Sequence, residues 1–255
     1  MKKSMIWDPQ LFKDHYERST NNNIIRFFSE KRKYEFYMDS LALKNSDIIL
    51  DAGCGYGRFS KLICNKVSKV IGVDINPENV SYASNYVGPK FEGHVVDLSL
   101  GKLPFDDNSI DKILFDNVLV FFNKEAQKKL FIEIKRVLKN GGVIAFNIEN
   151  ENYFLLSLSN LFTFLYKSKA KLQGKTTPTH HKYSISFYEK YLSELGFTNI
   201  KSIGDSFYKQ MGLGPIEIFP AFVYPSILNL DRKHYNTAKK NSMYSFTVAA
   251  TLSKY

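Results

Sequence analysis

The sequence has little cysteine and no long apolar run. Its 255 residues include only Cys54 and Cys64, with no CxxC pair and no Cys/His spacing of the zinc type. A disulfide scaffold is not favoured, no metal site is expected, and a reducing cytoplasm fits better. No segment approaches the roughly 20 apolar residues of a membrane span, and no apolar signal-peptide core follows the basic start Met1–Pro9. We therefore expect a soluble, cytoplasmic protein.

The excess of positive charge has two interpretations. A net charge of +10 and an isoelectric point of about 9.3 raise nucleic acid or an anionic membrane as partners. The lysines, however, are spread along a chain that is rich in Lys and Asn, and no aromatic residues interleave a basic stripe. A compositional bias explains the charge better, so we expect no nucleic-acid partner.

Short apolar runs alternate with helix-like stretches between residues 47 and 148. This alternation predicts a mostly parallel sheet covered by helices on both faces. A helix is expected over 124–138, ended by Asn140-Gly141-Gly142. The expected strands are Ile48–Leu50, Lys69–Val73, Phe91–Val96, Ile110–Phe115 and Val143–Ile148, and further helices are expected over Arg58–Lys66 and Pro77–Tyr86.

The regular alternation of apolar runs and helix-like stretches ends after residue 150. Tyr153–Tyr166 is apolar and compatible with a helix, and lysines follow it. Three readings stay open for it: a lid over a substrate, a core or oligomer-facing helix, or a helix resting on a lipid surface. Phe187–Leu195 predicts a helix stopped by Gly196, with a strand from Phe197, and Tyr244–Leu252 predicts a last strand. The segment from Gly212 to Lys240 has no clear pattern.

The most informative stretch is a glycine-rich turn between an apolar strand and a helix. It reads Asp51-Ala52-Gly53-Cys54-Gly55-Tyr56-Gly57. Glycines there let the backbone approach a ligand closely, and we expect free N–H groups of the turn to face that ligand. The third glycine of a dinucleotide fingerprint would fall at Arg58. The acid before the turn would repel a pyrophosphate but attract an ammonium or sulfonium group.

Two further acids end the neighbouring strands. Asp74 follows the second strand, where an acid can accept both hydroxyls of a ribose. Asp97 follows the third strand, where it could take the exocyclic amine of adenine. Each could instead be an ordinary capping acid. Together with Asp51 and the turn, they favour a cationic adenosine ligand, S-adenosylmethionine, over a nicotinamide dinucleotide.

These motifs resemble the class I S-adenosylmethionine-dependent methyltransferases of the small-molecule type, such as those of ubiquinone and menaquinone biosynthesis. Leu50–Gly57 looks like the first motif of that family, Phe115–Leu119 like its fourth-strand motif, and His181–Phe197, more weakly, like the segment before its sixth strand. The resemblance implies a Rossmann-like three-layer α/β sandwich. Its sheet would be mostly parallel and seven-stranded, with an antiparallel last strand.

The resemblance also implies one domain with four parts and a set of cofactor-binding residues. The parts are an N-terminal helical cap (1–45), where aromatic residues are dense, a cofactor-binding core (46–150), a lid insertion (151–184) and a C-terminal part that completes the sheet (185–255). The implied residues for S-adenosyl-L-methionine are Asp51, Gly53, Cys54, Gly55, Gly57, Asp74, Ile75, Asp97, Leu98 and Asn117.

The sequence departs from the family after the fourth strand. Many relatives carry an acid and a histidine there, whereas this chain has Val120, Phe121 and Phe122. The Asp/Asn-Pro-Pro-Tyr motif of methyltransferases acting on nucleobase or glutamine amino groups is also missing. If the reaction needs a base, the candidates are His15, Tyr16, His180 and His181.

The sequence therefore predicts methyl transfer to a small-molecule acceptor by in-line displacement. A lipid- or quinone-like acceptor is one option, with at most peripheral membrane contact, and the methylated atom and oligomeric state stay open. The alternatives are an NAD(P)-dependent oxidoreductase, an RNA methyltransferase, and a non-catalytic module that binds S-adenosylmethionine.

Overall fold

The computed structural model describes residues 33–152, 179–206 and 245–254, and Phe164, Ser168 and Leu172 between them. Several of the expected segments lie partly or wholly outside these residues. They are most of the N-terminal cap, with His15 and Tyr16, the apolar stretch Tyr153–Tyr166 apart from Phe164, and the segment from Gly212 to Lys240.

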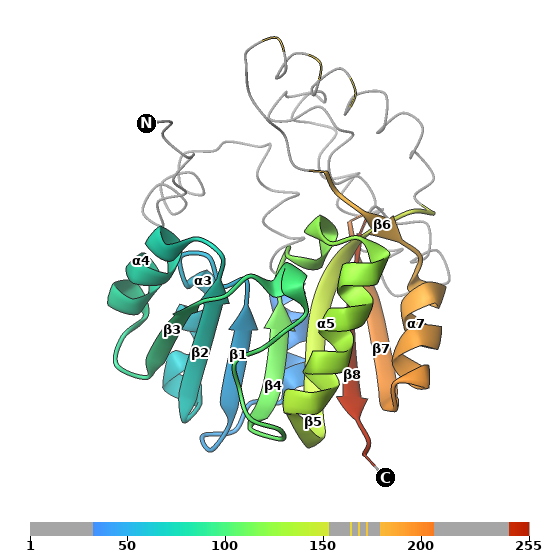
Figure 1. Cartoon of the computed structure of the whole chain (residues 1–255). Coiled ribbons are helices and arrows are strands. Elements are labelled where there is room, and N and C mark those ends of the chain that lie inside the picture. Colours follow the sequence, from blue (N-terminus) through green and yellow to red (C-terminus); the bar gives the residue numbers. More distant parts are fainter. Residues whose placement is uncertain are drawn as a thin grey trace, which may run out of the picture.

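One twisted sheet forms the centre of the protein (Figure 1). Seven of its strands run in the order β3-β2-β1-β4-β5-β8-β7, and β6 pairs with β5 outside this path. The strands are β1 (Ile48–Ala52), β2 (Lys69–Asp74), β3 (Phe91–Val95), β4 (Ile110–Phe115), β5 (Leu138–Asn150), β6 (Lys182–Tyr183), β7 (Phe197–Ser206) and β8 (Ser245–Leu252).

The first five strands are parallel, and β8 runs antiparallel to both β5 and β7. This confirms the predicted Rossmann-like architecture with an antiparallel last strand. The two-residue strand β6, parallel to β5, was not predicted.

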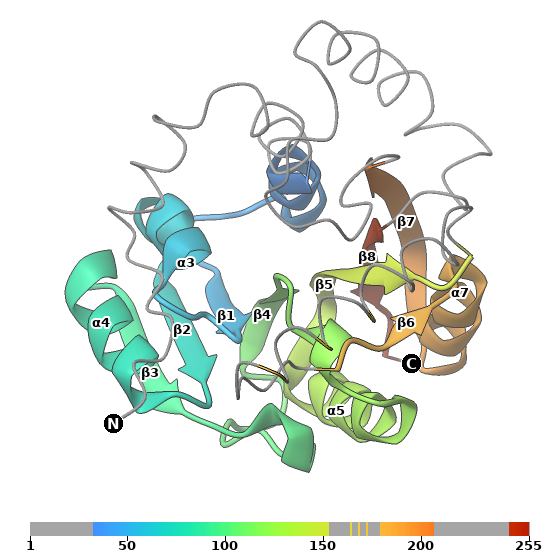
Figure 2. The ribbon, with the colours of Figure 1, turned by 90° about the horizontal axis from the view of Figure 1, so that it is seen from above.

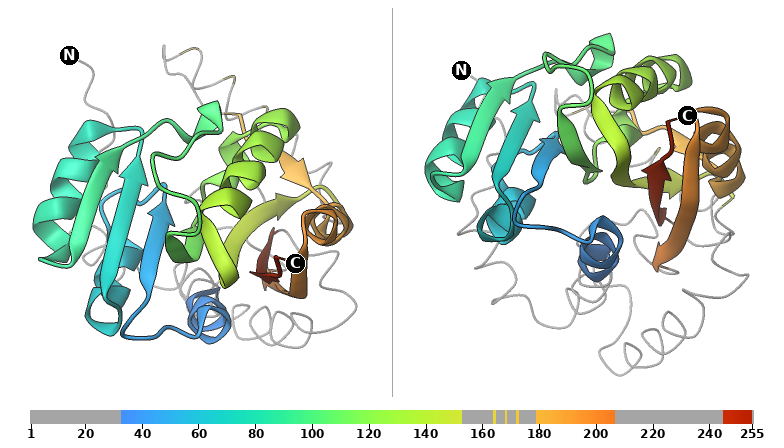
Figure 3. Two further views of the ribbon diagram at one scale, coloured as in Figure 1. Left: turned by 60° about the horizontal axis from the view of Figure 1, so that its bottom comes forward. Right: turned by 90° about the horizontal axis from the view of Figure 1, so that it is seen from below.

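Helices cover both faces of the sheet. α5 (Lys124–Val137) and α7 (Ile185–Glu194) pack on one face, where Leu130, Ile134 and Tyr188 are completely buried. The other face is covered by the helix at residues 33–41, by α3 (Arg58–Ile63) and by α4 (Pro77–Val87). Figure 3 shows the two helical layers on opposite sides of the strands. Because the parallel sheet is buried on both faces, its central strands are apolar at nearly every position.

Side-chain caps set where the helices begin. Asn76 precedes Pro77 and accepts a hydrogen bond from the Glu78 amide at 2.8 Å, and Asn123 caps α5 by accepting from the Ala126 amide at 2.9 Å. Ser184 caps α7 in the same way, so that helix begins at Ile185, two residues before the predicted start.

α5 ends one residue before the predicted position, and the glycines do not cause that end. The helix ends at Val137, because Leu138 already has extended backbone angles (φ −74°, ψ 133°) and pairs with Ile110 of β4. Gly141, with φ 74°, lies inside an irregularity of β5 rather than at the helix end. Pairing with a neighbouring strand therefore overrode the glycine stop signal.

Among the described residues, no helix is long and apolar enough to cross a membrane.

Candidate functional site

The carboxyl ends of the parallel strands meet along one edge of the sheet. β1 lies between β2 and β4, so the glycine turn after β1 is flanked by the residues that follow those two strands. Figure 2 looks onto this edge. The crevice outside the carboxyl ends, where the strand order reverses, is where open α/β sheets bind ligands.

All three glycines of the turn have positive φ: Gly53 and Gly57 at 78° and Gly55 at 52°. At Gly53 a Cβ would lie 2.3 Å from a methyl group of Val118, and at Gly57 it would lie 2.5 Å from a methyl group of Val87. At Gly55 a Cβ would meet nothing within 4 Å. Two glycines therefore permit close internal packing, and only the middle one leaves its backbone face open.

The amide groups of the turn bond inward, contrary to our expectation. Gly53 and Cys54 both donate to the carbonyl of Val73, at 2.7 and 2.9 Å, and Gly57 donates to the carbonyl of Cys54 at 2.9 Å. Gly55 donates to Oδ2 of Asp74 at 3.0 Å. These four N–H groups do not form a nest for an anion, because the end of β2 and the turn itself already accept their hydrogen bonds.

Asp74 joins the glycine turn to the start of α4. In addition to the Gly55 bond, its Oδ1 accepts from the Asn76 amide at 2.9 Å and from the Asn79 side chain at 3.1 Å. A carboxylate offers about four lone-pair sites, so three are in use. One further donor fits directly, and two ribose hydroxyls fit only if the Asn79 side chain rotates away.

Asp97 and two apolar residues lie next along the same edge. Oδ1 of Asp97 accepts from the amide and the hydroxyl of Ser99, at 2.9 and 2.6 Å, so the acid caps the short helix Leu98–Leu100. Within the described residues, Oδ2 of Asp97 has no hydrogen bond. Leu98 is buried, whereas Ile75 is 65% exposed directly after Asp74. An exposed aliphatic side chain between two acids suits the flat face and the amine of a purine.

Asp51 is buried beneath the turn, only 2% exposed. Its Oδ2 accepts from the Ser60 hydroxyl at 2.6 Å. Burial, together with the nearby charge of Asp116, raises the pKa of Asp51 to about 6. Its action on a bound cation would therefore be electrostatic, without direct contact.

Cys54 is also buried, and burial raises the pKa of its thiol well above the usual range. A thiol that stays protonated is a poor nucleophile. Cys54 can therefore contribute only its backbone and its packing to a site.

Asn117 lies at the end of β4 in a left-handed conformation, with φ 61°. It forms a two-way amide contact with Asn147 of β5: its backbone N–H donates to Oδ1 of Asn147 at 2.7 Å, and its own Oδ1 accepts from Nδ2 of Asn147 at 2.7 Å. The Tyr37 hydroxyl also donates to Oδ1 of Asn147, at 3.3 Å. Asn117 is exposed at the edge, but its amide is held by Asn147.

Asp116 forms a charged cluster that was not among the predicted site residues. It lies 2.6 Å from Nζ of Lys33 and 2.8 Å from Nη2 of Arg58, and it accepts from the Tyr34 hydroxyl at 3.3 Å. These partners come from the helix at 33–41 and from α3. The one available signal was an acid directly after a buried strand, next to Asn117.

The two histidine candidates lie at the same edge, beyond β5. Nδ1 of His180 is 2.8 Å from Oε1 of Glu149, and the His181 amide donates to the carbonyl of Val120 at 2.7 Å. The other candidates, His15 and Tyr16, lie outside the described residues. Among those residues, no group of three or more His, Cys, Asp or Glu side chains could hold a metal ion.

These residues fit S-adenosylmethionine better than a dinucleotide. The open backbone at Gly55, the carboxylate of Asp74 and the exposed Ile75 match an adenosine, and the acids along the edge match a positively charged group. A pyrophosphate would meet those acids without the amide donors that normally bind it.

Comparison with known proteins identifies the domain. Residues 50–146 match a family model described as "Methyltransferase domain". Uncharacterized protein MJ1123 of Methanocaldococcus jannaschii is 36% identical over 60% of this chain and 65% of its own length. A demethylmenaquinone methyltransferase of Tropheryma whipplei is 28% identical over 50% of this chain and 51% of its own length.

The chain thus spans less than two thirds of the length of both of these curated relatives. A solved S-adenosylmethionine-dependent methyltransferase from Methanosarcina mazei has the same fold, with a TM-score of 0.58 and 20% sequence identity. That match covers 87% of this chain and 99% of the other. Residues 50–146 therefore match a methyltransferase domain, and the sheet that they form with the flanking strands has the Rossmann-like fold of the class I S-adenosylmethionine-dependent methyltransferases.

Proposed function

We propose that the protein transfers a methyl group from S-adenosylmethionine to a small-molecule acceptor. The observation that carries this proposal is the glycine turn, whose amides bond inward and whose open middle glycine, Gly55, lies against the carboxylate of Asp74. Such a turn suits a ligand that brings positive charge and hydroxyl donors, and it does not suit a pyrophosphate.

Each residue has a distinct role in this proposal. Asp74 accepts the ribose hydroxyls, and Ile75 and Leu98 hold the adenine between them. Oδ2 of Asp97 accepts the adenine amine. Gly53, Cys54, Gly55 and Gly57 shape the turn, with Gly55 as its open face. Asn117 borders the methionine part of the ligand, and Asp51 acts on its positive charge from beneath the turn, without direct contact.

Methyl transfer does not require the protein to form a covalent bond with either reactant. Bound at this edge, S-adenosylmethionine would supply a methyl carbon that its sulfonium already activates. The residues of the chain would hold the two reactants in line and keep water out. A nucleophilic triad is therefore not needed for this activity.

The acceptor is proposed to be small and largely apolar. The demethylmenaquinone methyltransferase named above acts on a quinone, which fits this description. A malonyl-[acyl-carrier protein] O-methyltransferase of Pectobacterium atrosepticum, 33% identical over 38% of this chain, acts instead on an acyl group held by a carrier protein. Phe121, which follows β4 at the edge, is 47% exposed and offers an apolar contact for such a molecule.

Calorimetric titration tests the cofactor. We expect micromolar binding of S-adenosylmethionine and S-adenosylhomocysteine, no binding of NAD, and at least tenfold weaker binding of both adenosyl ligands by Asp74→Ala. Asp106→Ala is the matched control, because it removes an exposed acid just before β4, at the opposite edge of the sheet. Binding of NAD, or unchanged affinity in Asp74→Ala, would contradict the proposal.

Release of S-adenosylhomocysteine tests the reaction whatever the acceptor is. We would incubate the protein and S-adenosylmethionine with a quinol, a phenol, a free carboxylic acid and an acyl thioester in turn. Release above the acceptor-free background identifies the acceptor class. Tight cofactor binding with no release from any class would instead indicate a binding module.

A further inference from the structure

A histidine and a largely covered glutamate meet where β5 ends. Nδ1 of His180 lies 2.8 Å from Oε1 of Glu149, whose side chain is only 13% exposed, while the His180 side chain is 41% exposed. A carboxylate can only accept a hydrogen bond, so Nδ1 carries the proton. In the neutral imidazole this leaves the lone pair on Nε2, which has no hydrogen bond within the described residues.

Three contacts hold this histidine in place. The His181 amide bonds to the carbonyl of Val120, and the next residue, Lys182, pairs with Glu149 through the β6–β5 ladder. The ring of Phe121 meets the imidazole edge to face, with centroids 5.1 Å apart. The pair therefore joins the end of β5 to the residues just before β6, against the segment that follows β4, although 31 residues separate its members in the sequence.

The pair also lies on the same edge as the glycine turn. Val118 packs directly against Gly53 and begins the short segment that continues through Leu119–Phe121 to the imidazole. β1, β4 and β5 are adjacent strands and β6 pairs with the end of β5 (Figure 2), so the turn after β1 and the residues just before β6 lie along the same edge. An acceptor that reaches a methyl group held at the turn would approach from this stretch.

We propose that His180 is the general base for the acceptor and that Glu149 is its positioning residue, an inference that rests on the proposed function. The acceptor atom attacks the methyl carbon, a new bond forms between them, and the carbon–sulfur bond breaks with its electron pair going to sulfur. The proton of the acceptor atom passes to Nε2 of His180. Neither an oxidant nor a metal is needed.

This assignment narrows the acceptor class. A base is useful only when the acceptor keeps its proton near neutral pH. We therefore infer an acceptor that reacts through an O–H, N–H or weakly acidic C–H group, such as a phenol or quinol. A carboxylate, which has already lost its proton near neutral pH, would not need this base. Among the described residues, the ionisable groups beside His180 are Glu149, Lys182, whose Nζ lies 3.7 Å from Oε2 of Glu149, and the adjacent His181.

The tautomer of His180 tests the role of Glu149 without any acceptor. Nitrogen NMR of the full chain with S-adenosylhomocysteine bound should show the Nδ1–H tautomer for His180, and Glu149→Gln should shift the imidazole toward the Nε2–H form. Glu151→Gln, which removes an exposed acid at the same strand end, should leave the spectrum unchanged. An Nε2–H tautomer in the unchanged protein would overturn the proposal.

Turnover tests the role of His180. With a quinol as acceptor, His180→Asn should lower kcat about 10²- to 10⁴-fold, the usual range for a general base, and Glu149→Gln should lower it less. The KM for S-adenosylmethionine should stay within twofold of its original value. The control is His94→Asn, because His94 makes a similar contact with Glu92, at 2.6 Å, on β3.

The failure of this proposal differs from a failure of the proposed function. If His180→Asn keeps more than half of the turnover, His180 is not the base, although the methyltransferase activity stands. If calorimetry shows no binding of S-adenosylmethionine, the proposed function fails, whatever the tautomer of His180.

Discussion

Backbone conformation at single residues shapes the glycine turn. Gly53 and Gly55 both have positive φ, which costs an L-residue roughly 1–2 kcal/mol. They differ in surroundings, because only Gly53 lies against Val118. The two positions therefore separate the effect of backbone strain from that of packing.

We predict that Gly53→Ala destabilises the protein more than Gly55→Ala. Both variants place an L-residue at positive φ and strain the backbone, but only Gly53→Ala places a Cβ 2.3 Å from a Val118 methyl group. Urea unfolding should show a loss of about 3 kcal/mol for Gly53→Ala and about 1 kcal/mol for Gly55→Ala. Adding Val118→Ala to Gly53→Ala should remove part of the difference, and equal losses in the two single variants would refute this account.

The buried carboxyl group of Asp51 makes stability depend on pH. Its pKa is raised from 3.8 to about 6 in the folded state, so between these values the folded protein binds more protons than the unfolded chain. The contribution of Asp51 to the free energy of unfolding therefore falls as pH rises from about 4 to about 6. A shift of two pKa units corresponds to about 3 kcal/mol.

Asp51→Asn should remove this dependence while still accepting a hydrogen bond from Ser60. Relative to the original protein, the variant should gain up to about 3 kcal/mol between pH 4 and pH 7. Urea unfolding at pH 4, 5.5 and 7 measures the gain. Asp106→Asn, at an exposed position, should show no trend, and a pH-independent difference for Asp51→Asn would contradict the assigned burial effect.

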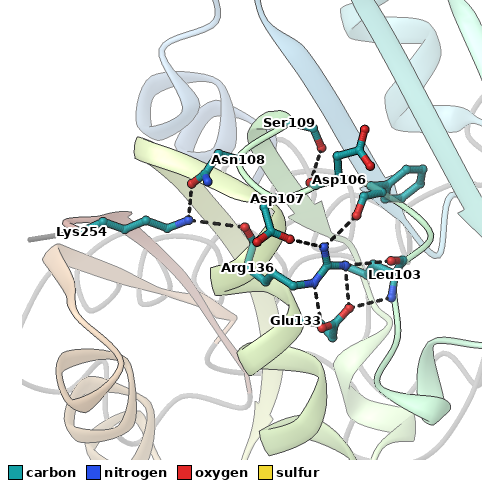
Figure 4. Close-up of polar contacts among 9 residues, drawn as sticks. Leu103, Asp106, Asp107, Asn108, Ser109, Glu133, Arg136 and Lys254 are labelled. Atoms are coloured by element: carbon teal, nitrogen blue, oxygen red, sulfur yellow. Dashed lines mark hydrogen bonds and ion pairs between the residues drawn. The ribbon is translucent and has the colours of Figure 1, made fainter.

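At the scale of elements, hydrogen bonds from one arginine connect the end of α5 to the loop before β4. The guanidinium of Arg136 bonds to both carboxylate oxygens of Glu133, at 2.9 and 2.8 Å, and to Asp107 at 2.7 Å. It also donates to the carbonyls of Leu103 and Phe105, at 3.0 and 2.9 Å. Figure 4 shows this network, with Lys254 reaching Asn108 and the carbonyl of Arg136 beside it.

Arg136→Lys should destabilise the protein by about 1.5–3 kcal/mol, because an ammonium group cannot make these five planar contacts together. Chemical denaturation measures the loss. Lys128→Gln on the same helix is the control: it removes only an exposed ion pair with Glu125, at 3.6 Å, and should cost less than about 0.5 kcal/mol. Similar losses in the two variants would show that the network adds nothing beyond a surface pair.

At the scale of the whole molecule, the candidate site lies at one edge of a single unit, formed by the sheet and its two helical layers. A ligand that binds only the folded state stabilises that unit. S-adenosylhomocysteine at 100 times its dissociation constant should add about 2.7 kcal/mol, which raises Tm by roughly 5–10 °C for a chain of this size. Thermal unfolding with NAD at the same concentration should show no shift, and a shift with NAD alone would favour the oxidoreductase.

The local elements of the core could be read from the sequence with small errors. Ile110–Phe115 is a strand with the predicted bounds, and α4 and β2 differ from prediction by one residue each. Apolar periodicity and strand-helix alternation are local signals, so they need no knowledge of the rest of the chain. The helix end at Val137 was missed because a strand partner far away in sequence decided it.

The sequence by itself determined the fold class, the glycine turn and the acids that follow the parallel strands, because local patterning dictates strand ends and strand ends share one edge. Only the tertiary structure decided that the turn's amides bond inward to β2 and that Asp116 meets Lys33 and Arg58. It also decided that Glu149 faces His180. These contacts join residues from separate elements, and side-chain orientation across such distances depends on packing that no local pattern records.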